Sequence, residues 1–73
     1  MEELTKRILN QFKEMGQTTL DLHVLLEAGG NDPGMRDRVV DLVNQLVRNG
    51  LLEEMGSDYY KITDAGQKAS TGA

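Results

Sequence analysis

The only histidine of the chain, His23, is the residue whose type most suggests metal chemistry. Glu27 follows it at i+4 and Asp21 is near, so a helix over this stretch would bring two or three possible ligands together. Such a set on one short helix makes a poor site, because structural zinc sites hold four ligands in a closed geometry. We interpret His23 as an exposed side chain beside a helical glutamate and predict no metal site.

Residues 29–34 (Gly-Gly-Asn-Asp-Pro-Gly) faintly resemble a phosphate-binding loop, but the lysine and Ser/Thr of a P-loop do not follow. They are better interpreted as a turn and a helix cap. Ser57 and Ser70 lie far in sequence from His23, the base that a serine nucleophile would need. The two glutamates at 53–54 are neighbours on an expected strand, so they point to opposite faces. The sequence therefore predicts a protein that is not an enzyme and that holds no cofactor.

Length and composition narrow the possible classes further. The chain has 73 residues, of which 38% are hydrophobic and 27% charged, and this predicts one globular domain spanning 1–73. The absence of cysteine excludes zinc fingers, disulfide scaffolds and thiol catalysis. No apolar run approaches the ~20 residues of a membrane span and no leader opens the chain, so we expect a cytoplasmic protein without a membrane partner. The net charge of −4 disfavours a dedicated nucleic-acid binder.

Apolar periodicity and capping residues predict four helices and a hairpin. The helices are expected at 2–15, 20–28, 33–49 and 63–69, the strands at 51–55 and 59–62, and a frayed tail at 70–73. Thr18 or Thr19 is expected to cap the second helix, with Asp21 in its first turn. Asp32 is expected to cap the third helix and Gly50 to end it in a left-handed conformation.

The third expected helix is amphipathic, with Val40 and Val47 at the edge of its apolar arc. These two valines either complete a broad core or extend onto the surface with Met55 and Tyr59 as an interaction patch.

The second half of the chain resembles the winged helix-turn-helix family. The resemblance is carried by Leu46-Val47-Arg48-Asn49-Gly50-Leu51-Leu52 and, after a short hairpin, by Tyr60-Lys61-Ile62-Thr63-Asp64-Ala65-Gly66. It covers nearly the whole chain and is strongest over 46–66. It implies an α+β fold, with a three-helix core, a two-stranded hairpin as the wing and a short C-terminal helix. Tyr60 and Ile62 are expected to point inward from the second strand.

The same resemblance implies a DNA-binding transcriptional regulator. Its partner would be duplex DNA, read by the helix at about 33–49 and the wing at 52–62, because a helix fits the major groove. By position in the family, the contacts would come from the helix, the wing and the segment before the second helix: Arg36, Arg38, Asn44, Gln45 and Arg48; Ser57 and Lys61; Gln17 and Thr18.

Charge leaves a second function open. The helix carries Asp37 and Asp41 against three arginines, and the wing carries Glu53, Glu54 and Asp58 against Lys61 alone. The combined surface is slightly acidic and provides little counterion release. The alternative is a winged helix that binds a basic protein through these five acidic residues. The oligomeric state stays open, and a dimer would use the first helix or a patch at Val47 and Tyr59.

Overall fold

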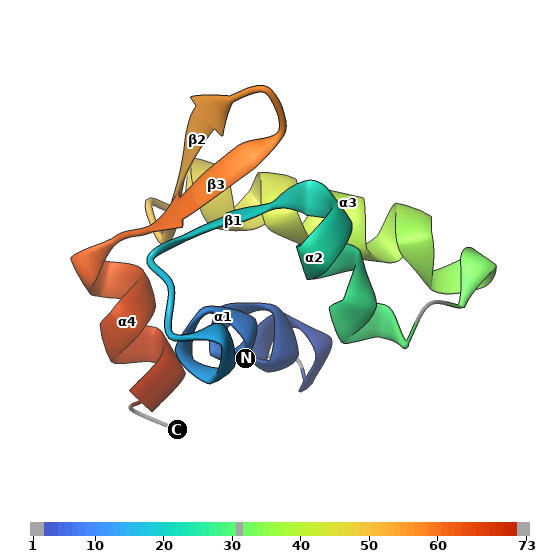
Figure 1. Ribbon diagram of the computed structural model, residues 1–73, viewed down its shortest axis with the longest axis horizontal. Coiled ribbons are helices and arrows are strands. Elements are labelled where there is room, and N and C mark those ends of the chain that lie inside the picture. The colour runs from blue at the N-terminus through green and yellow to red at the C-terminus, as the bar shows by residue number, and fades with distance from the viewer. Residues whose placement is uncertain (1–2, 31, 72–73) are drawn as a thin grey trace.

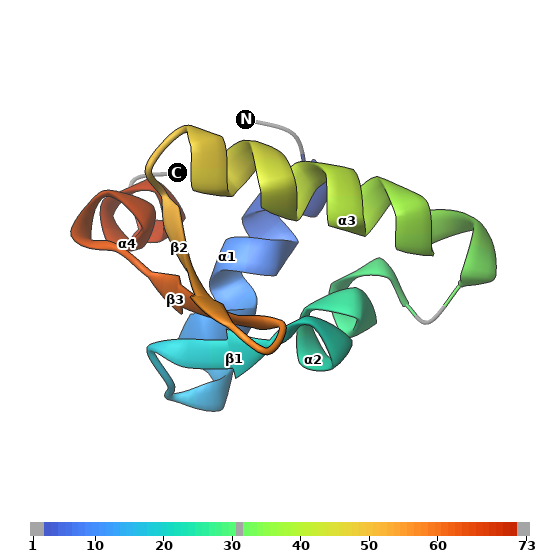
Figure 2. The same cartoon turned by 90° about the horizontal axis from the view of Figure 1, so that it is seen from above.

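The computed structural model describes residues 3–30 and 32–71, and the side chains of these residues except Thr71. Its elements follow in the order α1 (Glu3–Met15), β1 (Thr19–Asp21), α2 (Leu22–Leu26), a 3-10 turn η1 (Glu27–Gly29), α3 (Pro33–Arg48), β2 (Leu52–Gly56), β3 (Tyr59–Ile62) and α4 (Asp64–Thr71). Figures 1 and 2 show α1 beneath the sheet, α3 along the rear and α4 at one end beside α1. Among the described residues, no helix combines the length and apolarity needed to cross a bilayer.

The predicted α+β class is confirmed, and the arrangement is consistent with that of a winged helix. The sheet, however, has three antiparallel strands in the order β1-β3-β2, where the sequence predicted two. The additional strand, β1, pairs Leu20 with Tyr60 and Thr19 with Lys61. Both Leu20 and Tyr60 are buried on the inner face of the sheet. Leu20 was predicted to begin a helix, because a strand of three residues is too short to show a period of two.

The start of α2 also differs from the prediction. Its cap is Asp21, whose Oδ1 accepts a hydrogen bond from Val24 N at 2.8 Å, rather than Thr18 or Thr19. The helix is shorter than the predicted 20–28 and continues as the turn η1. At the other end of the chain, Ser70 was expected to fray. It lies in α4 instead, and its hydroxyl donates to Oδ1 of Asn10 in α1 at 2.7 Å.

The hydrophobic core lies between α1, α3 and the inner face of the sheet. Each of these elements contributes large apolar side chains that are almost fully buried. They are Leu4, Ile8, Leu9 and Phe12 from α1, Val39, Leu42, Val43 and Leu46 from α3, and Leu20, Leu52, Tyr60 and Ile62 from the sheet, with Leu25 and Ala28 beside them. Burial of one such side chain contributes roughly 1.5–3 kcal/mol. The core therefore fixes which face of α3 is turned outward.

The hydroxyl group of Thr63 connects the end of α3 to the base of the hairpin through hydrogen bonds. Gly50 follows the C-cap of α3 with φ +78°, a conformation that glycine adopts without strain. The Thr63 hydroxyl donates its one proton to two acceptors, the Gly50 carbonyl oxygen at 2.7 Å and the Leu51 carbonyl oxygen at 3.0 Å. The hydroxyl oxygen of Thr63 also accepts from Gly66 N at 3.0 Å and so caps α4. This network fixes the base of the hairpin against the end of α3.

Candidate nucleic-acid interface

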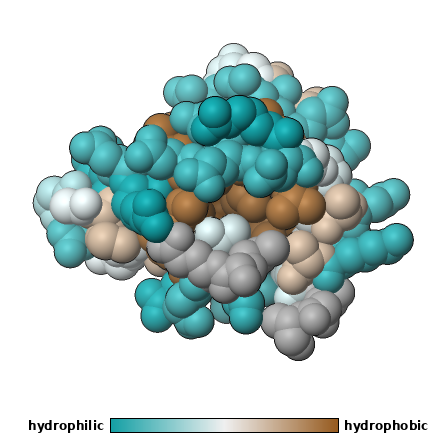
Figure 3. Space-filling model, turned by 180° about the vertical axis from the view of Figure 1, so that it is seen from behind, coloured by the Kyte–Doolittle hydropathy of each residue, from teal (hydrophilic) through white to brown (hydrophobic). Residues whose placement is uncertain are grey.

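All five residues of α3 that the sequence analysis selected are exposed: Arg36, Arg38, Asn44, Gln45 and Arg48. At 100° per residue, however, only four of them share the polar face, and Arg36 lies on the apolar side near the start of the helix. The helix begins as predicted, because Oδ1 of Asp32 accepts from Gly34 N at 2.9 Å and Pro33 is the first helical residue. Its apolar face is held in the core. Figure 3 views the molecule from the side on which α3 lies and shows a hydrophilic band above an apolar strip.

Two carboxylates interrupt this face. Asp37 and Asp41 are both exposed, and at 100° per residue Asp41 lies near the centre of the polar arc. Arg48 is seven residues further on and shares its side of the helix. A carboxylate in this position would meet phosphate oxygens or base acceptors in a groove, and only the N4 amino group of cytosine would be a favourable neighbour. The positive charges therefore lie toward the two ends of α3, and Asp41 places a negative charge between them.

The wing contributes Lys61 and Ser57, both exposed. Lys61 lies on the outer face of the sheet, in register between Thr19 and Glu53 of the neighbouring strands. Cross-strand partners in register have Cβ atoms about 5 Å apart, so the charge of Glu53 opposes that of Lys61. The positive potential that the wing could offer to a phosphate is correspondingly low.

The tip of the wing is a two-residue turn formed by Ser57 and Asp58, with φ angles of 51° and 64°. Positive φ at both positions is the signature of a type I′ turn, which matches the twist of a hairpin. The carbonyl oxygen of Asp58 accepts a hydrogen bond from Leu22 N at 2.7 Å. The tip is thus fixed to the start of α2, and Ser57 lies there.

Gln17 and Thr18 are not brought together with the α3 residues. They precede β1, and the carbonyl oxygen of Thr18 accepts from Ile62 N at 2.9 Å, at the base of the wing. Figure 2 shows this connection on the opposite side of the molecule from α3. Both residues instead line a cavity of about 300 Å³ between α1 and α4. The inserted strand β1 separates them from the N-terminus of α2, where the sequence analysis had placed them.

The pKa of Tyr60 is displaced by its surroundings. Burial raises the pKa of Tyr60 above its ordinary value of 10.0, and the negative charges of Glu54 and Asp58 raise it further. Glu54 is opposite Tyr60 in the ladder. Burial alone would raise this pKa, and the two carboxylates act in the same direction, in agreement with the acidic charge count of the wing.

The valines at the edge of the apolar arc are half-buried, and Val47 packs against the core. Met55 and Tyr59 are 53% and 46% exposed. The predicted inward direction of Tyr60 and Ile62 is confirmed, with 6% and 5% exposure.

One feature of the surface, the cavity, could not be selected from local sequence. Lys13, Gln67 and Ser70 line the cavity with Gln17 and Thr18, yet they come from helices at opposite ends of the chain. His23 is exposed on α2, as predicted, and Asp21 is engaged as the helix cap. Comparison of the chain with protein-family models, with curated proteins and with solved structures found no match.

Proposed function

We propose that this protein is a winged-helix transcriptional regulator that binds duplex DNA through α3, with the hairpin beside it. The observation that carries the proposal is the exposure of Arg38, Asn44, Gln45 and Arg48 on one face of a helix whose opposite face is fixed in the core, with Arg36 exposed near the start of the same helix. Arginine can bind guanine edges in a bidentate manner, and asparagine or glutamine can bind adenine. A helix with these residues exposed along its length has the chemistry that major-groove readers use.

Arg36 and Arg48 are twelve residues apart, which corresponds to about 18 Å along the helix axis. This span exceeds the ~12 Å width of the major groove. The two arginines are therefore assigned to phosphates at the groove edges, and Asn44 and Gln45 to base edges between them. Non-specific affinity is expected to be weak, with Kd about 10⁻⁴ M at physiological salt, because few cations face the DNA.

A second function is favoured by the wing. Its exposed side chains include Glu53, Glu54 and Asp58, and its one lysine is in register with Glu53. An acidic projection of this kind complements a basic protein surface better than a phosphate backbone. In that case the wing, together with Asp37 and Asp41, would be the binding surface.

The experiment that separates the two functions is an amide NMR titration with mixed-sequence duplex DNA at low salt. DNA binding predicts shifts concentrated on exposed positions of α3, with smaller shifts at Ser57 and Lys61. Glu14, an exposed residue of α1 outside both α3 and the wing, serves as the internal control, and its amide is expected to stay unchanged. Absence of shifts on α3 at low salt, where attraction is strongest, would remove the basis for DNA binding. A basic peptide that shifts the amides of 53–58 would then support the protein-binding function.

A further inference from the structure

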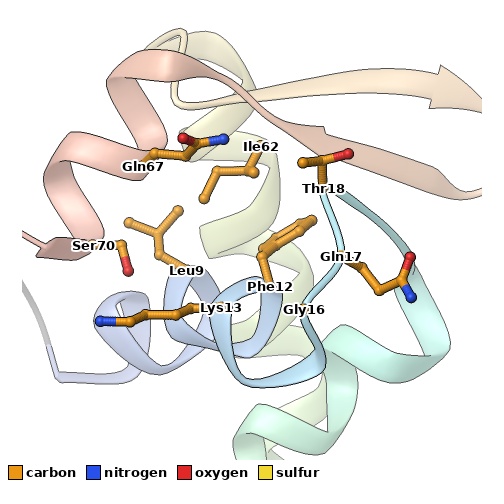
Figure 4. Close-up of a pocket in the computed structure, with 9 residues that line it drawn as sticks. All are labelled: Leu9, Phe12, Lys13, Gly16, Gln17, Thr18, Ile62, Gln67 and Ser70. Carbon is orange, nitrogen blue, oxygen red and sulfur yellow. The ribbon is translucent and has the colours of Figure 1, made fainter.

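The cavity between α1 and α4 has no role in either proposed function. It has a volume of about 300 Å³, at the lower end of the roughly 300–1,000 Å³ typical of small-molecule sites. Figure 4 shows Leu9, Phe12 and Ile62 around its centre, with Gln67 above and Lys13 and Ser70 at one side. Three parts of the chain meet here: α1 with the connection after it, the end of β3, and α4.

The floor of the cavity is apolar and rigid. Leu9, Phe12 and Ile62 are core residues with exposures of 0%, 2% and 5%, so their positions are fixed by packing. Most of the surface facing the cavity is carbon, which favours a hydrocarbon body in a bound molecule over a sugar or a phosphate. A shallow, preformed apolar recess loses little entropy on binding.

The charge around the cavity is the reverse of the charge of the chain. The protein has twelve acidic and eight basic residues, yet the cavity-lining residues within the described part of the chain include one lysine and no carboxylate. The cation is Lys13, which is exposed. The Ser70 hydroxyl donates its proton to Asn10, so it offers only an acceptor to a ligand. The ammonium of Lys13 is therefore the principal anchor for an anion.

We propose that this cavity binds a small monocarboxylic acid with an aromatic or branched aliphatic body. The body would lie over the apolar floor and the carboxylate would pair with Lys13. One cation beside a carbon-lined recess matches one negative charge, whereas a phosphate dianion would be left with a second charge unpaired and a cation would meet the like charge of Lys13. Because the ligand would touch both α1 and α4, its binding stabilises the folded state by mass action.

Sodium benzoate is a suitable probe, and benzamide is its neutral isostere. Benzoate is expected to shift amides near Lys13, Gln67 and Ser70 and to raise Tm, while benzamide binds about tenfold more weakly because it lacks the charge-assisted contact. Lys13→Gln should weaken benzoate binding about tenfold and leave benzamide binding unchanged. Lys61→Gln, which removes the same charge from the wing, should change neither.

Three results would overturn the proposal. They are benzoate shifts that avoid the cavity, equal binding of benzoate and benzamide, and equal losses of benzoate binding in Lys13→Gln and Lys61→Gln. Lys13 is exposed, so its replacement is expected to leave the fold intact, and an unchanged Tm without ligand confirms this directly. DNA binding is measured separately on α3, so failure of one proposal is distinguishable from failure of the other.

Discussion

Gly66 lies where α4 comes closest to the junction between α3 and the hairpin. A Cβ at this position would overlap the carbonyl oxygen of Leu51 and stand 2.8 Å from Cγ1 of Ile62. The Leu51 carbonyl cannot move freely, because it accepts from Thr63 N at 3.1 Å and from Thr63 Oγ1 at 3.0 Å. Overpacking typically costs ~1–3 kcal/mol, and each hydrogen bond broken by a shift adds about 1 kcal/mol. We therefore expect Gly66→Ala to destabilise the fold by about 3 kcal/mol.

Gly34 provides the matched control, since it also lies in the first turn of a helix. A Cβ there meets only Oδ1 of Asp32, at 3.4 Å. Helix propensity alone predicts that both substitutions stabilise by about 0.5–1 kcal/mol. Because of the close approach at Gly66, we expect the two changes in stability to have opposite signs: Gly66→Ala destabilises the fold and Gly34→Ala stabilises it. At ~4–8 °C per kcal/mol for a domain of this size, Tm should fall by about 12–24 °C in Gly66→Ala and rise by a few degrees in Gly34→Ala. Thermal unfolding of Gly66→Ala at or above the wild-type temperature would refute the described packing of α4.

Thr63→Ala should lower the free energy of unfolding by about 1–2 kcal/mol in urea titrations, because it removes the α4 cap and the contacts to the junction. Thr63→Ser keeps the hydroxyl, so it should keep most of the wild-type free energy of unfolding. Equal losses in the two variants would show that the hydroxyl is not responsible. The raised pKa of Tyr60 means that the folded state holds this proton more tightly, so its contribution to stability is complete below pH 10 and is lost as the pH rises through the folded pKa. Wild type should therefore lose stability more steeply than Tyr60→Phe above pH 10, and parallel pH profiles would contradict this. Asp41→Asn should tighten binding to mixed-sequence DNA and steepen its salt dependence by about one unit, because it removes a negative charge facing phosphates. Glu14→Gln on α1 should leave DNA affinity unchanged, and equal effects of the two changes would argue against contact through α3.

The longest elements were predictable because their own residues define them. The apolar positions of α3 recur at helical spacing, Asp32 and Pro33 mark its start and Gly50 follows its end. The exposed face of α3 followed from the same periodicity. Tyr60 and Ile62 alternate with exposed residues along β3, so their inward direction was also predictable.

The remaining features depend on contacts between distant segments. β1 exists because Leu20 meets Tyr60 forty residues later, and nothing in Thr19–Asp21 alone favours a strand over a helix start. Missing this strand led the sequence analysis to place Gln17 and Thr18 beside α2. The cavity likewise requires α4 to pack on α1, and Ser70 is held there by Asn10, sixty residues away. Local periodicity carries no information about such pairs.

The central claim is that α3 meets DNA through its arginines, and the salt dependence of binding tests it most directly. Fluorescence anisotropy with a mixed-sequence duplex should give a slope of log K against log salt of roughly −3 to −4, because Arg36, Arg38, Arg48 and Lys61 would displace three or four counterions. Arg48→Ala should reduce the slope by about one unit, and Arg7→Ala, which removes an arginine paired with Glu3 at 3.9 Å on α1, should not. A slope that Arg48→Ala and Arg7→Ala change equally, or no binding even at the lowest salt, would contradict the claim.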